Sequence, residues 1–157
     1  MKKLTFILLV IGIALSSCSK KDTFDPVAQA AADDVAIKAY LSAHPTINAT
    51  KDATGLYYQV ITQGTGTNPN INSVITVNYT GTLLDGTQFD SNTGRGAYTT
   101  ALQNVISGWQ IGVPYVKAGG RILLIIPSGM GYGNSSPGAG IPANAVLVFT
   151  IDLLTVK

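Results

Sequence analysis

The chain has 157 residues, of which 46% are hydrophobic and 11% are charged, so it has room for one domain with a core and is not a disordered acidic or basic chain. Its formal net charge of +2 comes from Lys2 and Lys3, because eight Lys or Arg residues balance eight Asp residues from residue 18 onward. A nucleic-acid-binding protein needs clustered Lys and Arg, and the sequence has no such cluster, so nucleic acid is excluded as a partner.

The reactive side chains are few, with one His, one Cys and no Glu. A zinc site of Cys and His needs about four ligands, and a Ser-His-Asp triad needs a His near its nucleophile. The only His, His44, precedes Pro45 in a segment that we interpret as a solvated linker. We therefore expect no metal and no cofactor, and any catalysis would depend on shape, hydrogen bonds and desolvation.

The N-terminus has the pattern of an export signal. Lys2 and Lys3 precede an apolar run over residues 4–15, which is shorter than the roughly 20 residues of a transmembrane helix. Residues 15–18, Leu-Ser-Ser-Cys, resemble the bacterial lipobox, in which the Cys becomes the acylated first residue of the mature chain. An ordinary signal peptide with an incidental Cys is the alternative, but Cys18 is the only Cys of the chain.

Lipidation at Cys18 would attach the protein to a membrane without a spanning helix. The expected location is therefore the bacterial cell envelope, as a lipid-anchored protein of the outer membrane on its periplasmic or surface face.

A helix is predicted after a polar tether over residues 19–25. Asp25 fits the N-cap and Pro26 the first helical position, and the helix is expected to continue over residues 27–43 until His44-Pro45 ends it. Its hydrophobic stripe is weak, so three roles stay open: packing on the domain, self-association, or a spacer roughly 25 Å long.

From Gly55 onward the pattern is that of β-strands. Strands are predicted over residues 56–61, 75–80, 88–90, 121–126 and 145–156, the last with Leu147, Phe149, Ile151 and Leu153 on one face. A helix of about two turns is predicted over residues 105–113, and the Gly-rich residues 128–144 form a long ordered loop or a mobile flap. One short helix against a bent antiparallel sheet is an α+β fold.

Four groups of residues resemble the signatures of FKBP-type peptidyl-prolyl cis-trans isomerases. They are residues 77–81 with 85–91, residues 105–109, residues 121–127 with 131–133, and residues 141–145 with 147–149. The resemblance covers about residues 54–157, and the helix before them is similar to that of lipid-anchored bacterial members. With the export signal, it divides the chain into a lipoprotein signal peptide over residues 1–17, a tether and helix over 18–51, and an isomerase domain over 52–157. For that domain the resemblance implies a bent antiparallel sheet wrapped around one short helix.

The resemblance also implies an apolar cavity for the substrate's proline ring, with Trp109 as its floor. The implied catalytic residues are Tyr79, Phe89, Asp90, Ile106 and Tyr132, and the implied substrate-binding residues are Val105, Trp109, Ile141, Phe149 and Tyr98. In this family the N–H at Ile106 and the hydroxyl at Tyr132 would hold substrate carbonyls, and Asp90 would face the twisting carbonyl or orient Tyr79. Each residue has an ordinary alternative: core packing for Trp109 and Phe149, a satisfied core hydroxyl for Tyr79, and a turn cap on Asn92 or Thr93 for Asp90.

The implied activity is isomerisation of X-Pro bonds in exported proteins, with proline-containing polypeptides as substrates and macrolides as inhibitors. A non-catalytic module that binds Pro-containing loops of a partner protein with the same pocket is the alternative function. A chaperone with weak isomerase activity would need a large inserted flap, and residues 135–140 are short and glycine-rich.

Overall fold

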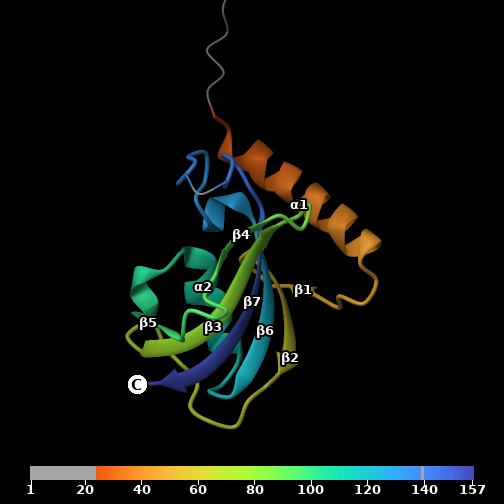
Figure 1. The fold of residues 1–157 in the computed structure, drawn as a ribbon. Coiled ribbons are helices and arrows are strands. Elements are labelled where there is room, and N and C mark those ends of the chain that lie inside the picture. The colour runs from red at the N-terminus through yellow and green to blue at the C-terminus, as the bar shows by residue number, and fades with distance from the viewer. Residues whose placement is uncertain (1–23, 139) are drawn as a thin grey trace, which may run out of the picture.

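The computed structural model describes residues 24–138 and 140–157, in which a seven-stranded antiparallel sheet bends around one short helix while a longer helix lies on its opposite face (Figure 1). The helices are α1 (Pro26–Ala43) and α2 (Ser107–Gly112), with 3₁₀ turns η1 (Leu102–Asn104), η2 (Val113–Tyr115) and η3 (Ser128–Met130). The strands are β1 (Thr50–Lys51), β2 (Tyr57–Thr62), β3 (Val74–Leu83), β4 (Gln88–Ser91), β5 (Tyr98–Ala101), β6 (Gly120–Ile126) and β7 (Leu147–Val156). The predicted α+β fold is confirmed.

Strand β3 organises the side of the sheet that carries the candidate site. The strand order is β1-β2-β6-β7-β3-β4, and β5 also pairs with β3. Strand β4 lies opposite the second half of β3, with Gly81 facing Asp90, and β5 lies opposite the first half, with Val77 facing Tyr98. Because Tyr79 lies between these two pairings, the register brings Asp90 and Tyr98 to either side of it.

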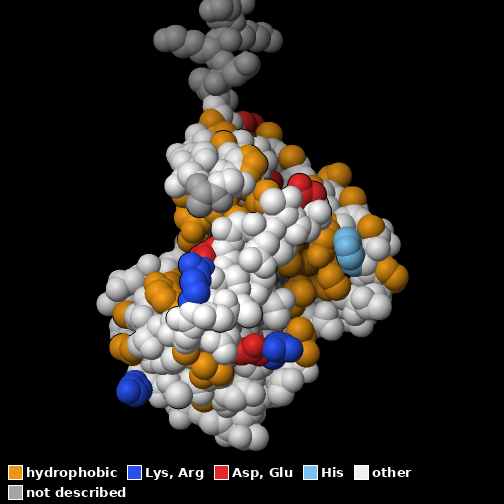
Figure 2. All heavy atoms as spheres, viewed as in Figure 1, with side chains coloured by type: hydrophobic (Ala, Val, Ile, Leu, Met, Phe, Trp, Pro, Cys, Tyr) orange, Lys and Arg blue, Asp and Glu red, His pale blue; other side chains and the backbone are white. Residues whose placement is uncertain are grey.

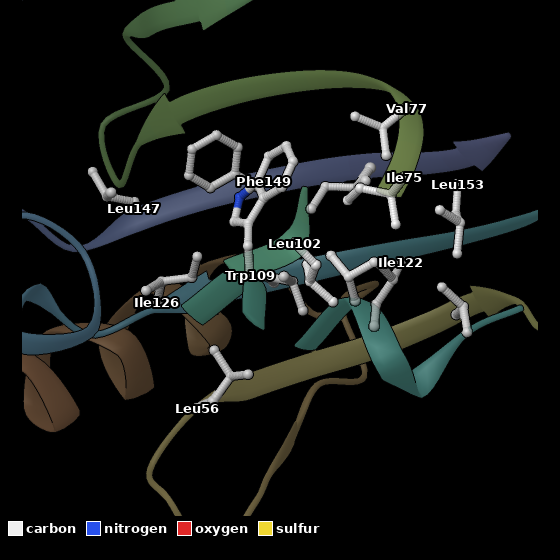
Figure 3. Close-up of a cluster of buried hydrophobic side chains, with 14 of the residues drawn as sticks. Leu56, Ile75, Val77, Leu102, Trp109, Ile122, Ile126, Leu147, Phe149 and Leu153 are labelled. Atoms are coloured by element: carbon white, nitrogen blue, oxygen red, sulfur yellow. The ribbon is translucent and has the colours of Figure 1, made fainter. Parts of the chain in front are cut away.

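The larger core fills the space between the sheet and α2 (Figure 3). The four residues predicted to share one face of β7, Leu147, Phe149, Ile151 and Leu153, all belong to this core and are at most 5% exposed. The alternation along the last strand therefore predicts its buried face correctly.

A second, smaller core lies on the opposite face of the sheet, under α1. Strand β6 contributes to both cores: Ile122, Leu124 and Ile126 enter the larger one, and Ile125 enters the smaller one. The nearly unbroken apolar run of this strand is thus explained, because both of its faces are covered.

Helix α1 begins and ends where the sequence predicts. The Oδ1 atom of Asp25 accepts hydrogen bonds from the N–H groups of Val27 (2.9 Å) and Ala28 (3.1 Å), and Pro26 occupies the first turn. Ile37 is fully buried in the smaller core. Of the three roles left open by the sequence, packing on the domain is therefore the one that the structure shows. Figure 2 shows hydrophobic side chains along α1 and at its junction with the sheet.

The predicted domain boundary between residues 51 and 52 falls directly after β1, which pairs with β2 through Thr50–Tyr58 and Lys51–Tyr57. Cys18 and the rest of the expected export signal lie outside the described residues. Among residues 24–138 and 140–157, no helix is long and apolar enough to cross a membrane.

Candidate active site

A pocket of about 280 Å³ opens where β3, β4, β5 and β7 meet the start of α2 and the loop after β6. It is lined by Tyr79, Asp90, Tyr98, Asn104, Val105, Ile106, Trp109, Tyr132 and Phe149. Eight of these nine residues are among those that the sequence predicts for the site. Residues from six separate segments therefore converge on one pocket.

The floor of the pocket is aromatic and nearly dry. Trp109 is 4% exposed, and the ring of Phe149 stands at 90° to its indole with the centroids 5.2 Å apart (Figure 3). The ring of Tyr79 stands at 79° to the same indole, with the centroids 5.3 Å apart. Edge-to-face contacts of this kind stabilise a fixed arrangement of rings. Among the described residues the buried indole Nε1 has no hydrogen-bond partner.

Helix α2 can lie close to β6 because glycines occupy the positions at which the helix crosses the strand. A Cβ atom at Gly108 would lie 2.5 Å from Cγ2 of Ile126, and one at Gly112 would lie 2.5 Å from Cδ2 of Leu124. The two glycines thus allow the helix backbone to lie directly on the strand, which fixes the depth of Trp109.

Tyr79 and Asp90 form a hydrogen-bonded pair at the edge of the pocket. The Tyr79 hydroxyl donates to Oδ2 of Asp90 at 2.6 Å, while Oδ1 accepts from the N–H of Ser91 (2.8 Å) and from Nη2 of Arg95 (3.1 Å). Burial and the bond to Asp90 raise the pKa of Tyr79 to about 12. Burial acts to raise the pKa of Asp90, but the three donors outweigh it and hold that pKa below its usual range. At neutral pH the pair is a phenol and a carboxylate.

The turn after β4 is held by Asn92, not by Asp90. The amide oxygen of Asn92 accepts the N–H of Tyr79 at 2.7 Å, and its Nδ2 donates to the carbonyls of Val77 and Gly96, both at 3.0 Å. The carboxylate of Asp90 caps neither Asn92 nor Thr93, so the turn-cap interpretation of Asp90 is not what the structure shows. An Asn in a Thr-Gly turn is a signal for such a role that the sequence analysis did not use.

Val105 and Ile106 form the entry to α2. The carbonyl of Ile106 accepts the N–H of Trp109 at 2.9 Å and so starts the helix. In the part of the chain that the structure describes, the N–H of Ile106 donates no hydrogen bond. Asn104, which the sequence analysis missed, lines the pocket just before this entry, and no local pattern marks it.

Tyr98 and Tyr132 are the exposed walls, at 43% and 41% exposure. Tyr98 begins β5 and stands edge-on to Tyr79 at a centroid distance of 5.9 Å. Tyr132 lies in the turn after η3, so its place is set by its backbone more than by packing of its ring.

Phe89 and Ile141, also predicted for the site, do not line this pocket. Phe89 packs edge-on against Phe149 at 5.5 Å, and both rings crowd Gly81, where a Cβ atom would lie 2.7 Å from each. Ile141 is 5% exposed and belongs to the larger core. Phe89 therefore packs against a lining residue, while Ile141 lies in the core.

The sequence profile of FKBP-type peptidyl-prolyl cis-trans isomerases matches residues 65–154, which hold all nine lining residues. The chain belongs to this family.

Named FKBP-type proteins are similar to it over most of its length. The FKBP-type peptidyl-prolyl cis-trans isomerase FkpA of Aeromonas hydrophila is 43% identical over 120 residues, covering 75% of this chain and 44% of that protein. The crystal structure of FkpA from Escherichia coli has a TM-score of 0.73 and 38% identity, covering 83% of this chain and 62% of that one. A peptidyl-prolyl cis-trans isomerase from Pseudomonas syringae pv. tomato has a TM-score of 0.69 and 31% identity, covering 86% and 98%. The chain spans less than half the length of the curated relative.

The FKBP pocket of this chain is built for binding and hydrogen bonding. Among residues 24–138 and 140–157, no group of three or more His, Cys, Asp and Glu side chains is placed to hold a metal ion. The residues that line the pocket supply aromatic rings, hydroxyls, a carboxylate, an amide and two aliphatic side chains. Such a site can take up an apolar ring and hold the carbonyls beside it.

Proposed function

We propose that this protein accelerates the cis-trans isomerisation of X-Pro bonds in polypeptides that pass through or reside in the cell envelope. The observation that carries the proposal is the Tyr79–Asp90 hydrogen bond at the edge of a pocket whose floor is the buried Trp109. Proline-containing polypeptides are the substrates, and macrolides are a second class of ligand for the same pocket.

The chemistry needs no nucleophile. An X-Pro bond isomerises over a barrier of roughly 20 kcal/mol because rotation breaks the resonance of the planar amide. The twisted amide has less charge separation than the planar one, so a dry aromatic pocket disfavours the ground state more than the transition state. Trp109 and Phe149, both at most 5% exposed, supply that dry surface.

Hydrogen bonds at the pocket edge would position the substrate. The N–H of Ile106 and the hydroxyl of Tyr132 would donate to the carbonyls on either side of the proline. The Tyr79 hydroxyl holds the carboxylate of Asp90 in place. From there the carboxylate would face the carbon of the twisting carbonyl group, while the carbonyl oxygen would point away from the carboxylate. Positioning of this kind is differential binding of the twisted amide.

A protease-coupled isomerisation assay on a short X-Pro peptide tests the proposal. The expected result is a first-order rate that rises in proportion to the concentration of the protein. Heat-denatured protein and a Trp109→Ala variant are the controls, and neither should raise the rate.

The alternative, a non-catalytic module that binds Pro-containing loops, predicts a different pair of results. Trp109 is the only Trp of the chain, so its fluorescence reports occupation of the pocket without interference. Saturable quenching by the peptide with no acceleration of isomerisation would favour the binding module. Acceleration together with quenching supports the enzyme.

A lipid anchor at Cys18 is proposed for the location of the protein. The basic start, the apolar run of residues 4–15 and the single Cys support it. In a bacterial host, the wild-type chain should incorporate labelled fatty acid and fractionate with membranes, while Cys18→Ala should remain an unacylated precursor. A wild-type chain that takes up no label would refute the anchor and leave the isomerase proposal untouched.

A further inference from the structure

Asp33, on α1, is a buried acidic side chain. It is 3% exposed, and its carboxylate accepts three hydrogen bonds, from Nε2 of Gln29 (2.8 Å) and from both the N–H and the hydroxyl of Ser128 (2.7 Å each). All three donors are neutral. A buried polar group is costly unless it is hydrogen-bonded, so these contacts compensate for the burial of the Asp33 side chain.

Ser128 connects Asp33 to the pocket. It lies in η3, is 1% exposed, and its carbonyl accepts the N–H groups of Gly131 (3.0 Å) and Gly133 (2.8 Å). These two glycines flank Tyr132, the pocket residue of this loop. The carbonyl of Gly133 in turn accepts the N–H of Asn144 at 2.8 Å, which ties the turn to the segment before β7.

Tyr132 is 41% exposed, so we expect the backbone contacts of the turn, more than side-chain packing, to decide its place. Figure 1 shows the loop that follows β6 lying beside the first half of α1, far along the chain from it. A hollow of about 750 Å³ remains between α1, residues 51–55 and residues 127–134, beside this turn.

We infer that Asp33 is a positioning residue for Tyr132, and that α1 completes the isomerase site by holding η3 through this carboxylate. The inference rests on the proposed isomerase activity. Asp33 touches no substrate; it fixes Ser128, Ser128 fixes the turn of Gly131 and Gly133, and the turn aims the Tyr132 hydroxyl at the pocket.

The next residue of the helix offers a matched control. Asp34 accepts hydrogen bonds from Nζ of Lys38, Nζ of Lys51 and the hydroxyl of Tyr57, so it attaches the same helix to β1 and β2. Among residues 24–138 and 140–157, Asp34 makes no hydrogen bond to the loop after β6. Asp34→Asn therefore loosens the docking of α1 without breaking the connection to Ser128.

The experiment measures kcat/KM, the affinity for an X-Pro peptide by Trp109 fluorescence, and amide hydrogen exchange at Gly131 and Gly133. For Asp33→Asn we expect a loss of about three- to tenfold in kcat/KM and in affinity, with faster exchange at both glycines. For Asp34→Asn we expect a change of less than about twofold in each. Ser128→Ala, which removes only the hydroxyl, should give a smaller loss in the same direction and serves if Asp33→Asn does not fold.

A double-mutant cycle with Tyr132→Phe separates positioning from general stability. If Asp33 acts through the Tyr132 hydroxyl, Asp33→Asn should reduce kcat/KM by less than about twofold in the Tyr132→Phe background. Full additivity would overturn the inference, and so would an Asp33→Asn variant that loses melting temperature but keeps its kcat/KM. A wild-type protein with no isomerase activity would refute the proposed function instead, while hydrogen exchange and peptide affinity would still decide whether Asp33 controls the turn.

Discussion

At the scale of residues, the contacts of Asp90 bear most directly on the proposed chemistry. Its carboxylate is bonded on one side to Tyr79 in the pocket and on the other to Arg95 at the surface, and the side chain is 47% exposed. An exposed ion pair of this kind contributes little to stability, so the pair with Arg95 does not explain the arrangement. We infer that the arrangement serves to orient the carboxylate of Asp90 toward the pocket.

We therefore predict that Asp90→Asn lowers kcat/KM by roughly ten- to thirtyfold, because no covalent step depends on it, and leaves the melting temperature nearly unchanged. Asp85→Asn is the control: Asp85 accepts the N–H of Thr87 at 2.8 Å in the hairpin turn, away from the pocket. Asp85→Asn should keep its kcat/KM. Normal turnover of Asp90→Asn with a lower melting temperature would assign Asp90 a structural role.

The shifted pKa values predict how activity depends on pH. The pKa of Asp90 lies below its usual range, so its contribution to stability and activity is present at neutral pH and is lost only as pH falls through that lowered value. The pKa of Tyr79 is raised from its ordinary value of 10.0 to about 12. The contribution of the protonated Tyr79 to stability is therefore fully present below pH 10 and is lost as the pH rises toward 12. We expect kcat/KM to be constant between about pH 5 and pH 9, measured by NMR exchange without a protease. Tyr79→Phe should move the acid limb to higher pH, because Asp90 loses a donor; an inflection between pH 5 and 9 in the wild type would contradict the assignment.

At the scale of elements, the sequence predicts the strands that have a clear local pattern and misses those that depend on pairing with distant segments. Strands β6 and β7, which supply much of the core, are predictable from their patterns, since β7 alternates and β6 is apolar on both faces. Strand β5 was not predicted: it has four residues, none of them fully buried, and it exists because it pairs with β3. The same holds for Asn92 and Asn104, whose roles depend on where distant segments lie. The pocket residues themselves were located through the family signatures, which encode that long-range arrangement.

In helix α2 we expect a substitution that raises helix propensity to lower stability. Gly108→Ala raises helix propensity by about 1 kcal/mol, but the new Cβ would lie 2.5 Å from Ile126. Overpacking of this kind costs about 1–3 kcal/mol, and it would also lift Trp109 from the floor. We expect lower stability by chemical denaturation and a lower kcat/KM. Gly129→Ala, where nothing lies within 4 Å of the added Cβ, should change neither; equal effects of the two substitutions would show that α2 is free to move.

At the scale of the whole molecule, the sheet is a shared wall between two cores. One core supports the pocket, and the other is closed by α1 through Ile37. The domain boundary expected from the sequence keeps every pocket residue but removes the cover of the second core and the two hydrogen bonds from Ser128 to the Asp33 carboxylate. Helix α1 is thus part of the folded unit.

The last prediction compares a fragment of residues 52–157 with the chain from residue 24. The fragment keeps the larger core and is expected to fold. It loses the burial of Ile37, worth roughly 1.5–3 kcal/mol on its own, and exposes Tyr57, Ile125 and Val148, so its melting temperature should fall and it should bind a hydrophobic dye. Its kcat/KM, measured well below the melting temperature, should fall by about as much as that of Asp33→Asn, because both lose the hold on Ser128. A fragment with the full melting temperature would show that the packing of α1 adds nothing to stability, and one with full activity would show that Tyr132 is placed without the helix.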